Sequence, residues 1–278
     1  MTTKRSPRLP KVREDELSSL AEEAGAQYPL PLDPHSILRS EGVTTSFNHY
    51  GEAFDGMLEW RDGSFHVFCN LTRVEAPGSS RARFTLAHEL GHYFIDAHRN
   101  ALVSGAAPSH PSLCDFQSSL LVEKEADFFA SALLMPKTRF ASATKRSSHG
   151  LEGVLELASQ FGTSVTATAL RYLQHEDGSP CVVVRWDSEG FGWKRLSSAA
   201  YAQGYRKTIE DARQLPRDSP TAKVLAGAAG RVQAGTTAAA WFPFVQASSP
   251  RNALLREEAV SLGRFGALTF LSWVDVVR

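Results

Sequence analysis

The chain has 278 residues, of which 42% are apolar and 22% charged, and its 30 basic and 30 acidic side chains give a formal net charge of zero. This composition is typical of a globular protein, and the neutral balance argues against a surface that binds polyanions as a whole. No apolar run approaches the roughly 18 residues of a membrane helix, and the three cysteines are too widely spaced for a disulfide framework. The basic start is followed by no apolar segment, so we expect no secretory signal. We therefore expect a cytoplasmic protein with no membrane partner.

The first 70 residues predict a basic arm, two helices and a group of short strands. Residues 1–13 contain lysines, arginines and prolines but no acid, which indicates a flexible arm. Residues 14–24 have the apolar spacing of a helix, and residues 36–40 predict a short second one. Residues 43–47, 56–60 and 65–70 are β-rich, and Arg61-Asp62-Gly63-Ser64 predicts a hairpin between the last two runs.

Helices dominate the middle of the chain and strands return near its end. Residues 80–96 and 119–135 predict two longer helices, joined by a loop in which residues 100–117 form a long insertion. Residues 151–161 and 165–175 predict a further helical pair. Beyond these, residues 181–186 and 191–196 predict paired strands, residues 197–205 a helix, and residues 266–277 a buried final strand. The whole order predicts an α+β fold.

One five-residue pattern, His88 to His92, indicates a metal site. His88 and His92 lie four residues apart in a predicted helix, so both imidazoles can reach one ion from the same face. Two imidazoles suit zinc in a site that keeps one position for water, and Glu89 would be the general base. The alternative is a surface helix with two ordinary histidines. Apolar Leu86 and Leu90 beside the pair disfavour that alternative.

Two histidines do not complete a zinc site, so a third ligand is needed. The candidates downstream are His98, His110, Asp115, Glu123, Glu125 and Asp127. Glu123 and Asp127 share a helix face, so one could bind the metal while the other accepts a hydrogen bond from a histidine ring. Glu125 points about 200° away from Glu123 around the helix, so both cannot easily reach one ion. The alternative is a charged solvent face at the start of this helix.

These motifs carry a family resemblance. Residues 83–92, followed by 123–127 and 129–136, resemble the ImmA/IrrE family of zinc metallopeptidases, and the resemblance covers about residues 30–175. It implies that Glu123 is the third zinc ligand, which leaves Asp127 as the hydrogen-bond acceptor, and that the core is a thermolysin-like zincin with a small sheet beside the metal helix. An extended substrate could add to an exposed edge of that sheet. By ligand type zinc is favoured, with Mn²⁺ or Fe²⁺ as alternatives.

The helical pair after the predicted core has helix-turn-helix character, but its second helix offers only Arg171 as a strong phosphate or guanine partner. Direct DNA binding is therefore disfavoured, and we expect the pair to pack on the peptidase. The remaining 100 or so residues resemble the extension of longer, IrrE-like members, which implies a mixed α/β, GAF-like sensor domain. We expect the aromatic residues of this extension to form its core rather than a ligand box; they are Trp186, Trp193, Trp241, Phe242 and Trp273.

The sequence thus predicts a flexible basic arm (residues 1–13), a metallopeptidase domain (14–145), a helix-turn-helix-like segment (146–178) and a C-terminal α/β domain (179–278). The resemblance implies a zinc endopeptidase that cleaves a helix-turn-helix repressor, and so derepresses stress, DNA-damage or mobile-element genes. The alternative is a catalytically silent regulatory protein that uses the same fold to bind protein or DNA. An intact Glu89 favours catalysis, because a purely structural zinc site needs no base.

Overall fold

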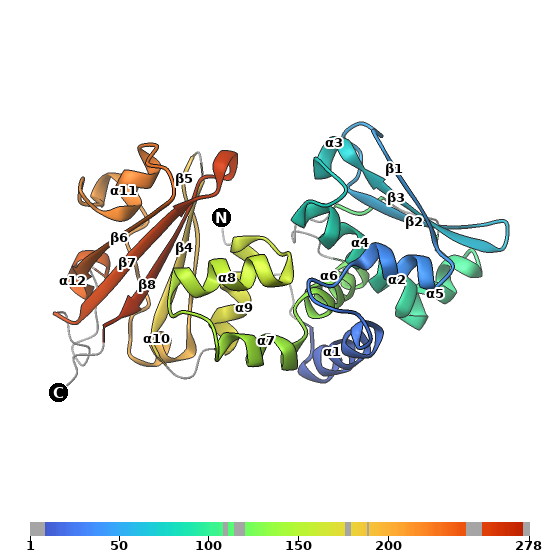
Figure 1. Cartoon of the computed structure of the whole chain (residues 1–278), viewed down its shortest axis with the longest axis horizontal. Helices are drawn as coiled ribbons and strands as arrows, with labels where there is room; N and C mark the ends of the chain where they lie inside the picture. The colour runs from blue at the N-terminus through green and yellow to red at the C-terminus, as the bar shows by residue number, and fades with distance from the viewer. Residues whose placement is uncertain are drawn as a thin grey trace. The chain divides into compact units, whose positions relative to one another are not determined.

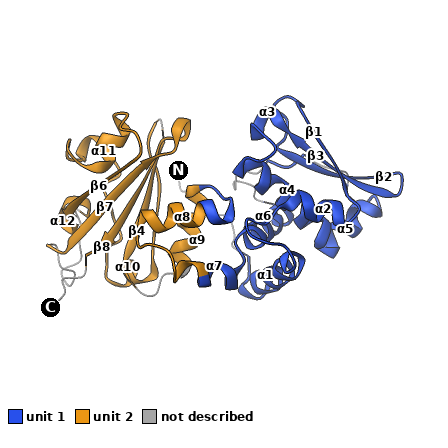
Figure 2. Cartoon of the chain, in the orientation of Figure 1, with its two compact units in different colours: residues 1–142, 159–164 blue, residues 143–158, 165–278 orange. Residues whose placement is uncertain are grey.

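The computed structural model describes residues 9–107, 111–113, 120–175, 179–187, 189–242 and 252–274. The chain divides into two compact units (Figure 2). The first contains residues 1–142 and 159–164, and the second contains residues 143–158 and 165–278. Each unit has its own sheet and its own apolar core, so each is described by itself.

The first unit combines helices with a small sheet (Figure 1). Its helices are α1 (Lys11–Gly25), α2 (Pro34–Ser40), α3 (Leu71–Val74), α4 (Ser80–Phe94), α5 (Asp96–Val103) and α6 (Leu121–Leu134), with α7 (Lys137–Thr144) following. Its strands are β1 (Thr44–Asn48), β2 (Gly56–Arg61) and β3 (Ser64–Asn70), in the order β1-β3-β2. β3 pairs parallel with β1 and antiparallel with β2, which leaves β2 at an edge of this sheet.

The predicted hairpin and strands are confirmed. Asp62 and Gly63 connect β2 to β3 with φ values of 52° and 79°, the left-handed pair that a two-residue turn requires. Arg61 pairs with Ser64 across this turn. The turn fixes the register, and the register in turn places Val67 and Cys69 on the buried face of β3.

The core of the first unit lies between α4, α6 and α1 (Figure 1). Leu86 and Leu90 face inward from α4, and Phe129 and Leu133 face inward from α6, all at 2% exposure or less. Burial of such side chains stabilises the fold by about 1.5–3 kcal/mol each. Pro136 follows the end of α6, as the sequence predicts, because proline cannot continue the backbone hydrogen bonds of a helix.

Two expectations for this unit differ from the structure. Residues 11–13 belong to α1 instead of the flexible arm, because Lys11 pairs with Asp15 and Arg13 pairs with Glu16 within the helix. The predicted insertion at residues 100–117 begins inside a helix, α5, which follows α4 after the single residue Ile95. Residues 1–8 of the arm and residues 108–110 and 114–119 lie outside the described residues.

The second unit is built on a five-stranded antiparallel sheet (Figure 1). Its strands are β4 (Cys181–Asp187), β5 (Gly190–Leu196), β6 (Arg231–Thr237), β7 (Leu254–Ser261) and β8 (Ala267–Trp273), in the order β5-β4-β8-β7-β6. The helical elements between the strands are α10 (Ser198–Ala202), η1 (Ala212–Gln214), α11 (Pro220–Leu225), α12 (Ala238–Trp241) and η2 (Gly263–Phe265). Two sheets with packed helices confirm the predicted α+β class.

Aromatic side chains fill the core of the second unit, as expected. Trp186, Trp241 and Phe242 are fully buried, and Trp273 packs against them. Trp193 differs, because it is only half-buried and its ring lies 5.5 Å from the Arg195 guanidinium. Hydrogen bonds complete this core, since a buried polar group without a partner is costly.

A buried polar network of the second unit surrounds Glu257 on β7. Its carboxylate, 1% exposed, accepts hydrogen bonds from the backbone N–H of Thr221 (2.9 Å), the Thr221 hydroxyl (2.7 Å) and the Trp241 indole (2.8 Å). Thr269 on β8 links the network to Trp186, whose indole donates to Thr269 Oγ1 at 3.2 Å. Glu257 thus joins α11, α12 and β7.

The helical pair begins and ends where the sequence predicts, as α8 (Leu151–Phe161) and α9 (Val165–His175). The expectation that the pair packs on the peptidase is wrong for α9. It packs on the sheet of the second unit, where Tyr172 meets Phe270 with ring centroids 5.8 Å apart. The backbone N–H of Leu151 at the start of α8 likewise donates to Glu258 of β7. Among the described residues, no helix is long and apolar enough to cross a membrane.

Candidate metal centre

Helix α4 carries the two histidines and the glutamate of the motif. Its first turn is capped by Ser79, whose hydroxyl accepts from the backbone N–H of Ala82 at 3.0 Å. His88, Glu89 and His92 are at most 4% exposed. The predicted alternative of a surface helix with ordinary histidines is therefore wrong.

Helix α6 lies beside α4 and brings a carboxylate to this pair (Figure 1). Glu123 Oε2 lies 3.3 Å from His88 Nε2, and Glu123 Oε1 lies 3.4 Å from His92 Nε2. The two Nε2 atoms are 3.1 Å apart. One ligand atom from each of these three buried residues lies within 4.8 Å of the others, which is the spacing of a group that can hold one metal ion.

Asp127, one turn after Glu123, contacts the opposite side of the first histidine. Its Oδ1 lies 2.9 Å from His88 Nδ1, so this nitrogen carries the hydrogen and Nε2 is the nitrogen directed at the cluster. Burial alone would lower the pKa of His88, but the hydrogen bonds with Asp127 and Glu123 raise it to about 10. Burial lowers the pKa of His92 to about 4.

Glu125 points away from the cluster, as its place on the helix predicts. It meets His98 of α5, whose Nε2 lies 3.0 Å from Glu125 Oε2, and Arg13 of α1, whose Nε lies 2.8 Å from Glu125 Oε1. The hydrogen bond with Arg13 holds the pKa of Glu125 below its ordinary value. The sequence predicts Arg13 to lie in the flexible arm, so its contact with Glu125 does not follow from the sequence. Of the other candidate ligands, His110 and Asp115 lie outside the described residues.

The start of β2 lies against Glu89. A Cβ atom at Gly56 would lie 2.7 Å from Glu89 Oε1 and 2.5 Å from Thr85 Cγ2, so any larger residue at this position would require these side chains to shift. Ser112, from the predicted insertion, forms an antiparallel bridge with Gly56. Its N–H donates to the Gly56 carbonyl at 2.9 Å, and its carbonyl accepts from the N–H of Asp55 at 2.9 Å.

Two arginines bind the side chain of Asp55, the residue just before β2. The Asp55 carboxylate is fully buried and accepts from Arg73 Nε at 2.7 Å and from Arg81 Nη2 at 2.8 Å. Arg73 comes from α3 and Arg81 from the first turn of α4. Because buried charges require partners, these pairs hold β2 in one position relative to the helix that carries Glu89.

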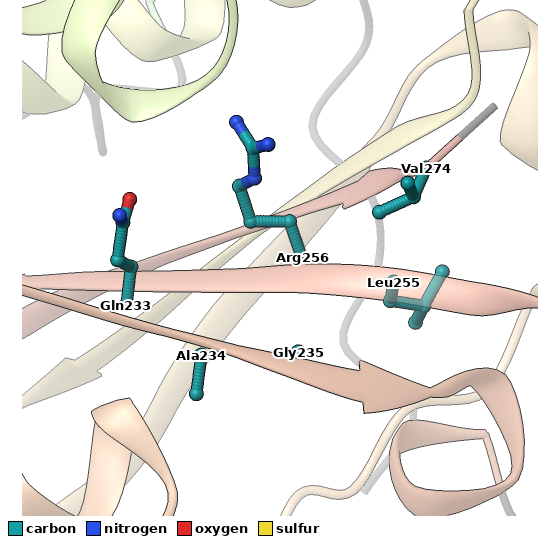
Figure 3. Close-up of a pocket in the computed structure, with 6 residues that line it drawn as sticks. All are labelled: Gln233, Ala234, Gly235, Leu255, Arg256 and Val274. Atoms are coloured by element: carbon teal, nitrogen blue, oxygen red, sulfur yellow. The ribbon is translucent and has the colours of Figure 1, made fainter.

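A hollow of about 320 Å³ lies elsewhere, on the sheet of the second unit (Figure 3). It is lined by residues of β6 and β7 and by the residue after β8; they are Gln233, Ala234, Gly235, Leu255, Arg256 and Val274. None of these residues belongs to the His88, His92 and Glu123 cluster. The hollow is therefore separate from the candidate metal centre.

Comparisons with known proteins agree with this site. Residues 77–173 match the model of a peptidase family described as the IrrE N-terminal-like domain. The radiation response metalloprotease IrrE of Deinococcus deserti is 26% identical over 224 residues, which cover 75% of this chain and 73% of that protein. The protein of the same description from Deinococcus radiodurans is 25% identical over 211 residues, covering 70% of this chain and 61% of that protein.

A solved structure shares the fold. A Mycobacterium tuberculosis transcriptional regulator superposes with a TM-score of 0.58 at 16% identity, over 96% of this chain and 89% of that chain. At this identity the likeness concerns the fold alone.

Proposed function

We propose, from the match of residues 77–173 to the IrrE N-terminal-like peptidase family, that the protein is a zinc-dependent endopeptidase whose ligands are His88, His92 and Glu123. The observation that carries this proposal is the buried cluster, in which these three side chains converge within 4.8 Å of one another. Two imidazoles and one carboxylate suit zinc and leave a position open for water. The same donors would accept Mn²⁺ or Fe²⁺ where those ions are available.

Each residue around the cluster has a separate task in the proposed mechanism. Zinc bound there would lower the pKa of water and polarise the scissile carbonyl. Glu89, which is buried and lies near enough to His88 to interact electrostatically, takes the proton from the attacking water and passes it to the leaving amine. Asp127 holds the Nδ1–H of His88 and so keeps Nε2 available as a ligand atom.

The edge of β2 is the place that we propose for the substrate main chain. Among the described strands of the first unit β2 pairs with β3, and a Cβ atom at its first residue, Gly56, would meet Glu89. The bridge between Gly56 and Ser112 supports this proposal, because it shows that the strand end pairs with an extended segment. Main-chain hydrogen bonds at such an edge bind peptides with little dependence on their side chains.

The substrate that we propose is a helix-turn-helix repressor in the cytoplasm. Two relatives described as radiation response metalloproteases support a role in a stress response. We also propose that the chain comprises an arm (residues 1–13, shortened by the start of α1), a thermolysin-like peptidase domain (14–145), a helical segment (146–178) and a GAF-like sensor domain (179–278). The separate sheet and core of the second unit support a distinct C-terminal domain.

Cleavage assays with metal control test this proposal. The metal-free protein is reloaded with zinc and incubated with repressors encoded near its gene. We expect a specific pair of fragments with the wild type, and none with Glu89→Gln, which should keep its zinc because residue 89 is not a ligand. Undiminished cleavage by Glu89→Gln would contradict the mechanism. A protein that holds zinc, cleaves no repressor and binds one tightly would instead be the catalytically silent regulator.

A further inference from the structure

A third imidazole lies beside the proposed ligands without joining them. The ring of His98 in α5 lies 5.1 Å from the ring of His92, centroid to centroid, at an interplanar angle of 42°. His98 is 7% exposed. His98 is not one of the three residues whose ligand atoms converge, so metal binding does not explain its position beside His92.

Glu125 fixes the orientation of this ring. Glu125 Oε2 faces His98 Nε2 at 3.0 Å, and because a carboxylate next to an arginine only accepts hydrogen bonds, Nε2 carries the hydrogen. Among the residues that the structure describes, His98 Nδ1 has no hydrogen-bond partner. Within the described residues, the contact with Glu125 is therefore the polar contact that sets the plane and tautomer of His98.

Glu125 is itself held from a third helix. Arg13 of α1 donates from Nε to Oε1 at 2.8 Å and from Nη2 to Oε2 at 3.0 Å. This two-point contact fixes both the position and the plane of the carboxylate, which a lysine could not do. The chain of contacts runs from Arg13 through Glu125 and His98 to the ring of His92, and it joins α1, α6, α5 and α4.

We propose that Arg13, Glu125 and His98 form a positioning relay, in which the arginine fixes the carboxylate, the carboxylate fixes the His98 ring, and that ring holds the His92 imidazole at its metal-binding position. The inference rests on the proposed function, because it assigns His92 as a ligand. Partners behind a ligating side chain set its orientation, and their loss typically weakens metal binding. The competing explanation is that the three residues only tie α1 to the other helices.

Metal binding distinguishes these explanations. The readouts are zinc affinity by competition with a chelator, the visible spectrum of the cobalt-substituted protein, and urea unfolding of the metal-free form. We expect Glu125→Gln and Arg13→Ala to lower zinc affinity about tenfold and to shift the cobalt bands. Lys11→Ala, which removes the pairs of Lys11 with Glu14 and Asp15 on the same helix and touches no member of the relay, is the matched control and should match the wild type.

Two further variants keep the test decisive if either of the first variants folds poorly. His98→Phe keeps a ring against His92 but cannot bond Glu125, so the relay predicts the same loss as Glu125→Gln and no further loss in the double variant. Arg13→Lys keeps the charge and removes the two-point contact, and the relay predicts an intermediate affinity. Wild-type zinc affinity and cobalt spectrum in His98→Phe or in both Arg13 variants, with reduced stability alone, would overturn the relay.

The relay and the proposed function can fail separately. A wild-type protein that binds zinc but cleaves no repressor disproves the peptidase while the affinity measurements still decide the relay. A wild-type protein that binds no zinc disproves both.

Discussion

Gly91 of α4 lies against the backbone of Ala126 in α6, so closely that a Cβ atom at residue 91 would lie 3.0 Å from the Ala126 Cα atom. Glu123 and Asp127, the carboxylates that meet the histidines, stand three residues before and one residue after Ala126. The close approach of the two helices is therefore what brings the α6 carboxylates within reach of the α4 imidazoles.

Gly91→Ala should separate these helices. Overpacking costs about 1–3 kcal/mol, whereas alanine gains about 1 kcal/mol in helix propensity over glycine. We expect a net loss of up to about 2 kcal/mol in the free energy of unfolding. We also expect zinc binding to weaken at least about tenfold, because the carboxylates of α6 would move away from the histidines. Urea unfolding and chelator competition measure both. Gly78→Ala, where a Cβ atom meets open space, should change neither, and wild-type zinc affinity in Gly91→Ala would contradict this account.

Gly56→Ala should impair catalysis while zinc stays bound. The added methyl group would press on Thr85 Cγ2, 2.5 Å from its position, and on the Glu89 carboxylate, 2.7 Å away, and its three nearest atoms include none from a proposed ligand. Because a displacement of about 1 Å in a reacting group can reduce rates about a hundredfold, we expect kcat to fall by a factor of about 10–100 with full metal content. Gly235→Ala, on an open face of β6, is the control. Loss of zinc in Gly56→Ala would show that the strand end supports the ligands instead.

Asp127→Asn keeps the shape of the side chain that holds His88 but removes its charge. The hydrogen bond at 2.9 Å becomes weaker, so the His88 ring is less firmly oriented and less basic as a ligand. We expect zinc affinity to fall by a factor of about 10–100, as measured by chelator competition. Asp15→Asn, at an exposed position of α1, should leave affinity unchanged. Equal zinc affinities in Asp127→Asn and Asp15→Asn would show that Asp127 does not support metal binding.

Zinc binding should strengthen as pH rises. Zinc requires neutral imidazoles, and in the metal-free protein the pKa of His88 is raised to about 10, so this ring must release a proton on binding. The pKa of His92 is lowered to about 4, so His92 is already neutral and releases none. Apparent affinity should therefore rise about tenfold per pH unit through the neutral range. Chelator competition at several pH values measures the slope, and proton release in a weak buffer measures the stoichiometry. A slope of zero would contradict the ionised His88.

Glu257→Ala should destabilise the second unit and leave the metal centre intact. The substitution leaves three donors, two on Thr221 and one on Trp241, buried without their acceptor. Loss of such a network costs about 3 kcal/mol or more, which urea unfolding followed by tryptophan fluorescence would detect. Zinc affinity should match the wild type, since all proposed ligands lie in the first unit. Glu210→Ala, at an exposed pair with Lys194, is the control.

The sequence predicted the elements whose patterns are local. The motif helix, the hairpin at Asp62-Gly63 and the helical pair α8 and α9 follow from periodicity and turn residues, and they lie where expected. The third ligand could not be chosen by spacing alone, because His98, Glu123 and Glu125 all lie downstream at distances that a fold can bring together. Only the packing of α6 on α4 separates their roles.

The elements that were missed depend on long-range contacts. β7 carries Glu257 and Glu258 side by side, and both are 1% exposed, so no alternation of polar and apolar residues marks it as a buried strand. Each carboxylate is tolerated there because partners distant in sequence reach it, Thr221 on one face and Leu151 on the other. β6 was missed for the opposite reason, since it is an edge strand whose residues are mostly exposed.

The buried carboxylate of Asp55 restricts which substitutions this protein tolerates around it. Replacing Arg73 or Arg81 alone removes one arginine from a buried charge, and replacing Asp55 alone leaves two arginines without their shared acceptor. Because each single replacement costs stability, we expect the three residues to change together, for example to an apolar set of similar volume. None of these positions is a proposed ligand or base, yet through Gly56 they set the position of the strand end beside Glu89.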